Sequence, residues 1–186
     1  VATETENSID VSQFEYFEDF ASLDTKTKLY DAFGAENLED GSAWFAEGTV
    51  EFQTTTLTDP NTLNMYYYMW DQNDNETLSF IEAPALLWDE NYETARRQVV
   101  QSKAGIFTGM SLKDLHAWND GVDFSFSGFG WDYEGGIWAD EGTKLGDLDV
   151  QVKLTLEDYT SSDANNLMGD MELNTADEGM LESPII

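Results

Sequence analysis

The chain carries one histidine, His116, and no cysteine. A serine–histidine–aspartate triad would have to use His116 as its base. That residue falls in an expected amphipathic helix, and no strand–turn–helix nucleophile elbow lies near it. Zinc sites built from clustered histidines or thiolates, thiol nucleophiles and disulfides are excluded by the same counts. We therefore expect His116 to be a surface or half-buried helix residue.

Oxygen ligands gather in a short polar loop. Asp71, Asn73 and Asn75 alternate along it and offer the carboxylate and amide oxygens that calcium prefers. The EF-hand pattern fails, because Glu76 stands at the sixth position, where that motif has glycine, and Glu82 at the twelfth lies beyond an expected strand. Two interpretations stay open, a weak calcium site or the polar tip of a hairpin. No other cofactor is expected.

Paired carboxylates could hydrolyse glycosides, but 38 acidic residues make chance pairs unavoidable. Asp132 is the most distinctive acid, because it lies between Trp131 and Tyr133. Burial between the two rings would raise the pKa of this carboxyl, as in a general acid. The alternative, which we favour, is a turn aspartate that accepts hydrogen bonds from backbone amides. A carboxylate-based hydrolase is thus the third function considered.

Aromatic side chains could form a binding face in two places. Tyr66, Tyr68 and Trp70 share one face of an expected strand, whereas Trp131, Tyr133 and Trp138 belong to a glycine-rich run at 128–138. That run predicts a sharp turn or bulge between two strands, since glycine adopts backbone shapes that other residues resist. Exposed, these rings would suit sugars or a protein partner. Buried, they would be core.

The charge balance limits the partners. Eight lysines and arginines stand against 38 aspartates and glutamates, which gives a formal net charge of −30. Such a surface repels phosphate, so nucleic acid and anionic lipid are not expected partners. Cations, a basic protein or a salty medium fit it better. No apolar run reaches membrane-spanning length, so no membrane span is expected.

The elements that must position these residues combine helices with antiparallel strands, so we expect an α+β fold. A helix over 13–21 would begin at a Ser12–Glu15 capping box, and Asp24 can cap a second helix that ends at Gly34. A third helix, 112–118, would be capped by Ser111. Strands are expected at 44–45, 50–57, 65–70, 77–81, 96–101, 122–127, 137–138 and 150–156, and 65–70 should be a central strand. A long loop is expected at 82–95, and edge strands are expected at 168–173 and 184–186.

The order of elements predicts an internal repeat. A flexible lead, 1–10, precedes one domain, 11–186, that holds two pseudo-repeats and a C-terminal extension. Each pseudo-repeat, about 25–81 and 105–158, is a short helix followed by antiparallel strands, and the extension covers 159–186.

Three segments resemble a family of uncharacterised bacterial secreted proteins and lipoproteins. They read GIFTGMSLKDL, then Asn119–Asp120, then FSFSGFGWDYEGG, and the tail segment LMGDMELNT fits as well. The family has glycine where Asp120 stands here, with Gly121 next, so the turn is shifted by one residue. More distantly, the helix-plus-strands unit is similar to the repeats of β-lactamase-inhibitor proteins and small outer-membrane assembly lipoproteins. The resemblance implies an envelope location and protein binding, and no enzyme activity.

We therefore expect a non-catalytic exported protein that binds a protein partner. A carbohydrate- or small-ligand-binding module with an aromatic face, with or without calcium, is the alternative. The chain opens at Val1 without an initiator methionine, which indicates a trimmed mature end and fits an upstream signal peptide or lipid anchor. The expected location is periplasmic, outer-membrane-anchored or extracellular.

Overall fold

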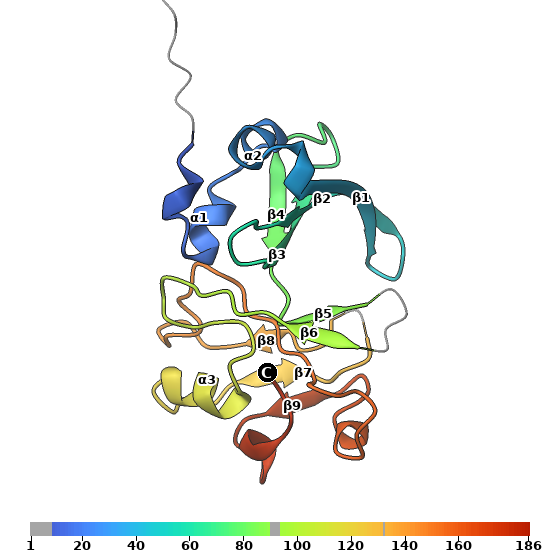
Figure 1. Ribbon diagram of the computed structural model, residues 1–186. Coiled ribbons are helices and arrows are strands. Elements are labelled where there is room, and N and C mark those ends of the chain that lie inside the picture. The colour runs from blue at the N-terminus through green and yellow to red at the C-terminus, as the bar shows by residue number, and fades with distance from the viewer. Residues whose placement is uncertain (1–8, 90–93, 132) are drawn as a thin grey trace, which may run out of the picture. The chain divides into compact units, whose positions relative to one another are not determined.

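The computed structural model describes residues 9–89, 94–131 and 133–186 (Figure 1). The chain divides into two compact units, Val1–Pro84 and Ala85–Ile186. Each unit contains helix and antiparallel strand, so the fold is mixed α+β, as predicted. The division falls between the two ranges expected to repeat. Of the expected flexible lead, residues 1–8 lie outside the described part of the chain.

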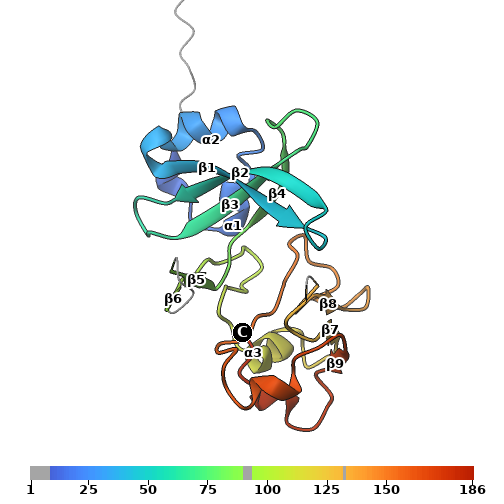
Figure 2. The same cartoon turned by 90° about the vertical axis from the view of Figure 1, so that its right-hand side faces the viewer.

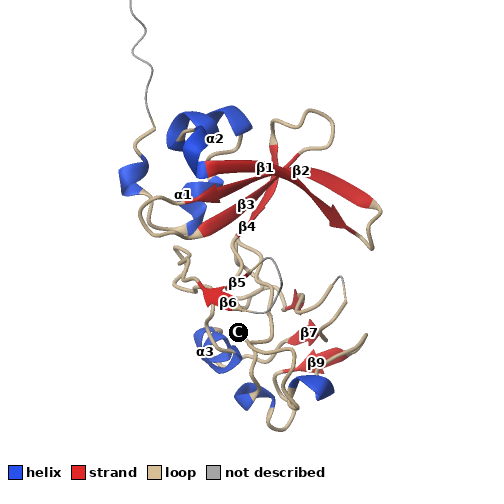
Figure 3. Cartoon of the chain, turned by 45° about the vertical axis from the view of Figure 1, so that its right-hand side comes forward, coloured by secondary structure: helices blue, strands red, loops and turns tan. Residues whose placement is uncertain are grey.

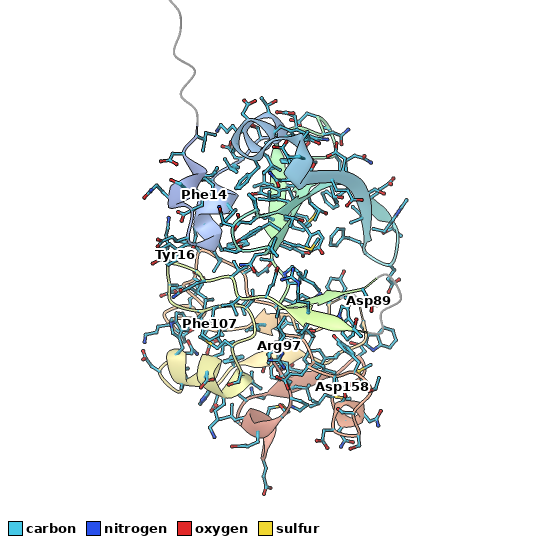
Figure 4. All side chains as sticks on the ribbon, in the orientation of Figure 1. Phe14, Tyr16, Asp89, Arg97, Phe107 and Asp158 are labelled. Atoms are coloured by element: carbon cyan, nitrogen blue, oxygen red, sulfur yellow. The ribbon has the colours of Figure 1, made fainter. Side chains whose placement is uncertain are left out.

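The N-terminal helices of the first unit begin later than predicted. A 3-10 turn, η1 (Val11–Gln13), is followed by extended backbone at Phe14 and then by α1 (Phe17–Ala21) (Figure 4). The prediction of one helix over 13–21 is wrong because two acids supply other acceptors. The Asp10 carboxylate accepts from the Ser12 N–H at 3.1 Å, and the Asp19 carboxylate accepts from the Tyr16 N–H at 3.0 Å. The first bond starts η1 and the second starts α1, so the two turns do not merge into one helix.

The second helix, α2 (Lys26–Phe33), ends at Gly34, as predicted. Its cap is Thr25, whose hydroxyl accepts from the Lys28 N–H at 3.2 Å. Asp24, the expected cap, instead pairs with the Lys28 ammonium at 2.6 Å. Gly34 has a φ of 73°, a left-handed value that glycine adopts readily. A short 3-10 turn, η2 (Ala35–Asn37), then leads into the sheet.

Four antiparallel strands follow in simple order, β1-β2-β3-β4 (Figure 2). They are β1 (Leu38–Phe45), β2 (Val50–Thr58), β3 (Met65–Trp70) and β4 (Leu78–Glu82). β3 pairs with both β2 and β4, which confirms the central strand predicted from its apolar residues. β1 pairs with β2 without interruption from Leu38–Leu57 to Phe45–Val50.

α1 and α2 pack against one face of this sheet (Figure 1). The Tyr66 ring stacks on Phe20 with centroids 4.0 Å apart, and the Tyr68 hydroxyl donates to the Phe20 carbonyl at 2.9 Å. The Trp70 indole N–H donates to the Thr55 hydroxyl at 2.9 Å. That hydroxyl donates to Asp40 at 2.6 Å. Burial of large aromatic surface is favourable here because each polar tip keeps a partner.

The second unit holds less regular structure, and most of it runs as loops (Figure 3). It contains the hairpin β5 (Leu86–Trp88) and β6 (Ala95–Arg97), the helix α3 (Leu112–Trp118), and a sheet of order β8-β7-β9. That sheet consists of β7 (Ser125–Ser127), β8 (Ile137–Trp138) and β9 (Glu172–Asn174), and two 3-10 turns, η3 (Ala164–Asn166) and η4 (Met180–Glu182), complete the unit.

Two predictions for loop and strand in this unit are wrong, whereas its helix and the strand at 137–138 are confirmed. The segment 82–95, expected to be a loop, contains β5. The strand expected at 150–156 is irregular chain that makes single bridges from Lys153 to Gly136 and from Leu156 to Ile185. α3 is confirmed together with its cap, since the Ser111 hydroxyl accepts from the Asp114 N–H at 3.1 Å.

The C-terminal residues join the core of the second unit. Ile185 and Ile186 are buried, and Thr155 and Ile186 exchange backbone hydrogen bonds of 2.8 and 3.0 Å. The expected edge strand at 184–186 is therefore a single bridge, and the one at 168–173 is shifted to β9. The two units share antiparallel pairing but differ in strand order, and the tandem repeat stays a prediction.

The network at Asp40 predicts how stability depends on pH. Partial burial would raise the pKa of Asp40, but hydrogen bonds from Thr55 and Lys26 and the Lys26 charge outweigh it and hold the pKa below 3.8. A lowered folded-state pKa gives stability that is present above the unfolded value and lost as pH falls through the folded one. We expect Asp40→Asn to lower the free energy of unfolding by about 1 kcal/mol at pH 7, because the site is half exposed.

That difference between variant and native protein should shrink as pH falls below about 4, where the native carboxyl also becomes neutral. Urea unfolding followed by circular dichroism across this range measures it. Glu141→Gln, at an exposed position, is the control for loss of one charge. A difference that stays constant down to pH 2 would show that the Asp40 charge does not stabilise the unit.

Candidate functional site

The two sets of predicted aromatic residues have opposite environments. Tyr66, Tyr68 and Trp70 are buried in the first unit, with exposed fractions of 2%, 0% and 0%. Burial raises the pKa values of both tyrosines above the ordinary 10, and their side chains are core. Trp131, Tyr133 and Trp138 lie in the second unit and are 59%, 76% and 57% exposed. Asp132 lies outside the described residues.

The exposed set belongs to a turn between β7 and β8, as predicted from its glycines. We call residues 128–138, apart from 132, the aromatic turn. Its base is closed by the bond from the Ser127 N–H to the Gly136 carbonyl, 2.9 Å, and from the Gly135 N–H to the Ser127 carbonyl, 3.2 Å. The Gly135 carbonyl accepts a further bond from the Leu154 N–H at 2.9 Å. Hydrogen bonds therefore connect the turn to Ser127 of β7 and to Leu154.

Phe129 anchors the same turn in the core. Its side chain is fully buried, and its ring centroid lies 6.3 Å from that of Phe126. Its backbone N–H donates to the Leu167 carbonyl at 2.9 Å, and its carbonyl accepts from the Gly169 N–H at the same distance. With Phe129 inward, the chain immediately after it emerges into solvent, where Trp131 lies.

Glu134 holds the tip of the turn. One of its carboxylate oxygens accepts from the Gly130 N–H at 2.7 Å, and the other accepts from the Tyr159 hydroxyl at 3.1 Å. Burial raises the pKa of Tyr159, so this hydroxyl stays protonated as a donor. The sequence reasoning missed both residues. An acid four positions after a turn glycine is a signal for such a bond, but among 38 acids it is not specific.

The surface beside the aromatic turn is apolar and acidic. Met171 is exposed, and its carbonyl accepts from the Gly128 N–H at 2.8 Å. Asp170 and Glu172 flank Met171 and are also exposed, while Lys153 bridges to Gly136. The exposed indole and phenol rings are thus accompanied by carboxylates, and this combination suits an apolar partner surface that carries cations.

His116 does not form a catalytic triad with its neighbours. Its Nε2 lies 3.0 Å from Oδ1 of Asp123, and the Thr175 hydroxyl donates to that same oxygen at 3.1 Å. In a triad the hydroxyl faces the imidazole, which removes its proton, and the carboxylate lies on the far side of the ring. Here both groups share the carboxylate, and Thr175 is buried. The contact with Asp123 therefore connects His116, a half-buried helix residue, to the chain that follows α3.

The predicted calcium ligands lie in the loop between β3 and β4. Asp71 accepts from the N–H of Asn73 at 2.8 Å and from its side-chain amide at 2.9 Å. Asn75 has a φ of 54°, and its N–H donates to the Asp71 carbonyl at 2.8 Å. Asp74 accepts from Thr77 and Glu76, and these bonds lower the pKa of its carboxyl. One carboxylate oxygen of Asp71 and the Asp74 carboxylate thus already serve as acceptors that close the turn.

Two further findings bear on the site. Within the part of the chain that the structure describes, no group of three or more acidic or histidine side chains is arranged to hold a metal ion. Of the described helices, none combines the length and apolar character needed to cross a membrane.

Gly135 is the position where the aromatic turn tolerates least change. Its φ is 63°, and a Cβ there would clash with the backbone carbonyl of Leu154. Gly142 has a similar left-handed φ of 83°, but a Cβ would meet nothing within 4 Å. We expect Gly135→Ala to lower the free energy of unfolding by about 2–4 kcal/mol, the sum of backbone strain and overpacking. Gly142→Ala should cost about 1 kcal/mol, the strain alone. Equal losses in chemical unfolding would contradict the packing described for the turn.

The loop hydrogen bonds also predict the response to calcium. Because Asp71 and Asp74 accept bonds within the turn, we expect about 10 mM calcium chloride to raise the melting temperature no more than sodium chloride of equal ionic strength. Differential scanning calorimetry measures the two shifts. A larger shift with calcium, lost in Asp71→Asn, would instead establish a calcium site in this loop.

No protein-family model, curated protein or solved structure matched the chain in the three comparisons made. The resemblance to bacterial secreted proteins and lipoproteins therefore stays a prediction. The aromatic turn combines a hydrogen-bonded backbone, a buried phenylalanine anchor and three large rings that are more than half exposed.

Proposed function

We propose that this protein is a non-catalytic binding protein that docks a basic protein partner through the aromatic turn. One observation carries the proposal. Trp131, Tyr133 and Trp138 are each more than half exposed, although their turn is held by backbone hydrogen bonds and by Glu134. Exposure of large apolar rings to water is unfavourable, and burial of these rings against a partner would be favourable.

Ordered aromatic side chains are efficient binding residues. Tryptophan and tyrosine dominate binding energy at protein interfaces, where they enter desolvated pockets of the partner. A turn that is ordered before binding also loses less conformational entropy on association. The bonds that fix Gly130 and Gly135 therefore support a role for the turn as a preformed surface.

Charge selects the class of partner. A net charge of −30 favours association with a positively charged surface and disfavours phosphate-rich partners such as nucleic acid and anionic lipid. Lysine and arginine bind well to indole faces. The chain already uses this contact internally, since the Lys144 ammonium lies 5.9 Å from the centroid of the Trp118 ring. A basic partner could make the same contact with Trp131 and Trp138.

Export is part of the proposal. The resemblance to secreted proteins and lipoproteins supports a periplasmic, outer-membrane-anchored or extracellular location. The same resemblance supports two related helix-plus-sheet units of the kind found in β-lactamase-inhibitor proteins, which bind other proteins. Under this proposal the second unit supplies the binding turn.

A carbohydrate ligand is the second candidate, because the exposed rings of Trp131 and Tyr133 would also stack on sugar faces. The exposed carboxylates of Asp170 and Glu172 favour a basic protein partner, because a neutral sugar has no positive charge for them to attract. Loss of oligosaccharide binding in Trp131→Ala, with no protein captured, would replace the first candidate by the second.

Site-specific photo-crosslinking tests the proposal. A benzophenone amino acid replaces Tyr133, or Phe107 as the control, since Phe107 is an exposed ring elsewhere in the second unit (Figure 4). Each protein is incubated with an extract of the organism that makes it, and crosslinked proteins are identified. We expect a partner with a basic surface to be crosslinked from position 133 and not from position 107.

The purified partner then gives a quantitative test. Trp131→Ala and Tyr133→Ala should each raise its Kd by roughly 30-fold, as expected for truncation of an interface hot spot worth about 2 kcal/mol. Phe107→Ala should leave the Kd within about twofold. A partner that binds all three variants equally well would show that the aromatic turn is not the binding surface.

A further inference from the structure

The outer edge of β1 is a second surface without a partner, in the first unit. Among the described residues β1 pairs only with β2, so the backbone groups of every second residue point away from the sheet. Glu39 to Ser42 and Trp44 are exposed along it, with Trp44 at 60%. Such an edge is a template for another strand.

This edge carries Glu39 and Asp40 but lacks the other features that usually prevent strand pairing. β1 has eight residues, in unbroken register with β2, and contains no proline and no lysine. The opposite edge differs. β4 has five residues, its register with β3 shifts at Met69/Trp70, and Pro84 follows it closely. Bulges, short strands and proline all disfavour added strands, so β1 is the edge open to a partner.

A hollow beside β1 provides room for the partner's side chains. It measures about 430 Å³ and lies over the sheet face, where it is lined by Gly41, Ala43 and Phe45 on β1 and by Thr54, Thr56, Tyr67, Met69 and Glu82 on β2, β3 and β4. Gly41 and Ala43 alternate with residues that face the other side of the sheet. Because they carry little or no side chain, a fifth strand could place every second side chain over them. Cross-strand neighbours of this kind stabilise a sheet.

Charge indicates the chemistry of that strand. Glu39 lines the hollow, Glu51 is exposed on the neighbouring strand, and the whole chain carries −30. Two copies of this chain would repel each other at such an edge, whereas a cationic segment would be attracted. We propose that the β1 edge binds an extended, basic segment of a protein partner as a fifth strand, with its apolar side chains in the hollow. This site is independent of the aromatic turn.

Synthetic peptides test strand addition. The probe is a blocked peptide of about eight residues that alternates lysine and valine, a length that matches β1. The control alternates lysine and proline, which keeps the charge but removes half of the backbone donors and cannot form a strand. At about 0.15 M salt, where the Debye length is near 8 Å, we expect the proline peptide to bind at least about tenfold more weakly.

Hydrogen exchange locates the peptide without any change to the protein. At saturating lysine–valine peptide, amides within Leu38–Phe45 should exchange more slowly, while those of β9 should not change. No binding, no added protection in β1, or equal affinity for the proline peptide would overturn the proposal. Protection of β1 in the free protein that depends on protein concentration would show that a second copy is the occupant, and would overturn it as well.

A pair of variants separates the hollow from general electrostatics. Ala43→Arg places a bulky cation in the hollow and should raise the Kd for the lysine–valine peptide at least about tenfold. Val122→Arg adds the same charge at an exposed position of the second unit and should change the Kd by less than about threefold. Equal effects of the two variants would show that charge alone attracts the peptide.

Discussion

The excess of carboxylates over cations is the constraint on which the rest of this structure depends. With 38 acids and only eight lysines and arginines, few acids can be neutralised by ion pairs. Ion pairs within the described residues include those of lysines and arginines with Asp24, Asp40, Asp120, Glu157 and Glu182. The remaining acids must be solvated or must accept hydrogen bonds. Stability therefore comes from aromatic and aliphatic burial, and the carboxylates contribute mainly as local acceptors.

The turns show how the acids are used. Asp10, Asp59, Asp71, Asp74 and Asp158 each accept from a backbone N–H two or three residues later in the chain. Such bonds fix loops without lysine or arginine. Hydrogen bonds from the Ser12 and Thr160 hydroxyls, followed by the backbone bonds, lower the pKa values of Asp10 and Asp158, and backbone bonds from Thr77 and Glu76 lower the pKa of Asp74. Glu134 applies the same chemistry at the aromatic turn, where its carboxylate holds both Gly130 and Tyr159. The acid-rich composition on which the proposal of a basic partner rests also supplies hydrogen-bond acceptors to the proposed binding surface.

Local signals in the sequence were sufficient where one interaction dominates. The Ser111 cap of α3, the Gly34 end of α2 and the apolar run of β3 were all predicted because each depends on neighbouring residues alone. Predictions failed where two local acceptors compete, as for Asp10 and Asp19 around the first helix. They also failed where pairing depends on distant chain, as at 150–156, whose bridges are to Gly136 and Ile185.

The candidate site was predictable only in part for the same reason. Glycines and aromatics at 128–138 predicted a turn with rings, but alternation along a strand does not say which face is covered. Tyr66 and Tyr68 contact Phe20 of α1, whereas Phe129 turns inward from the aromatic turn and Trp131, Tyr133 and Trp138 stay exposed. Glu134 and Tyr159 are 25 residues apart, and their contact depends on the path of the chain between them.

The central claim is that the aromatic turn is ordered before any partner binds. Backbone order parameters from nitrogen-15 relaxation test this most directly in the free protein, at Gly130, Glu134 and Gly135. The hydrogen bonds of these residues predict values near about 0.85, as in rigid backbone. Values below about 0.6 would mean that the turn is flexible on the picosecond-to-nanosecond timescale, and would contradict a preformed binding surface.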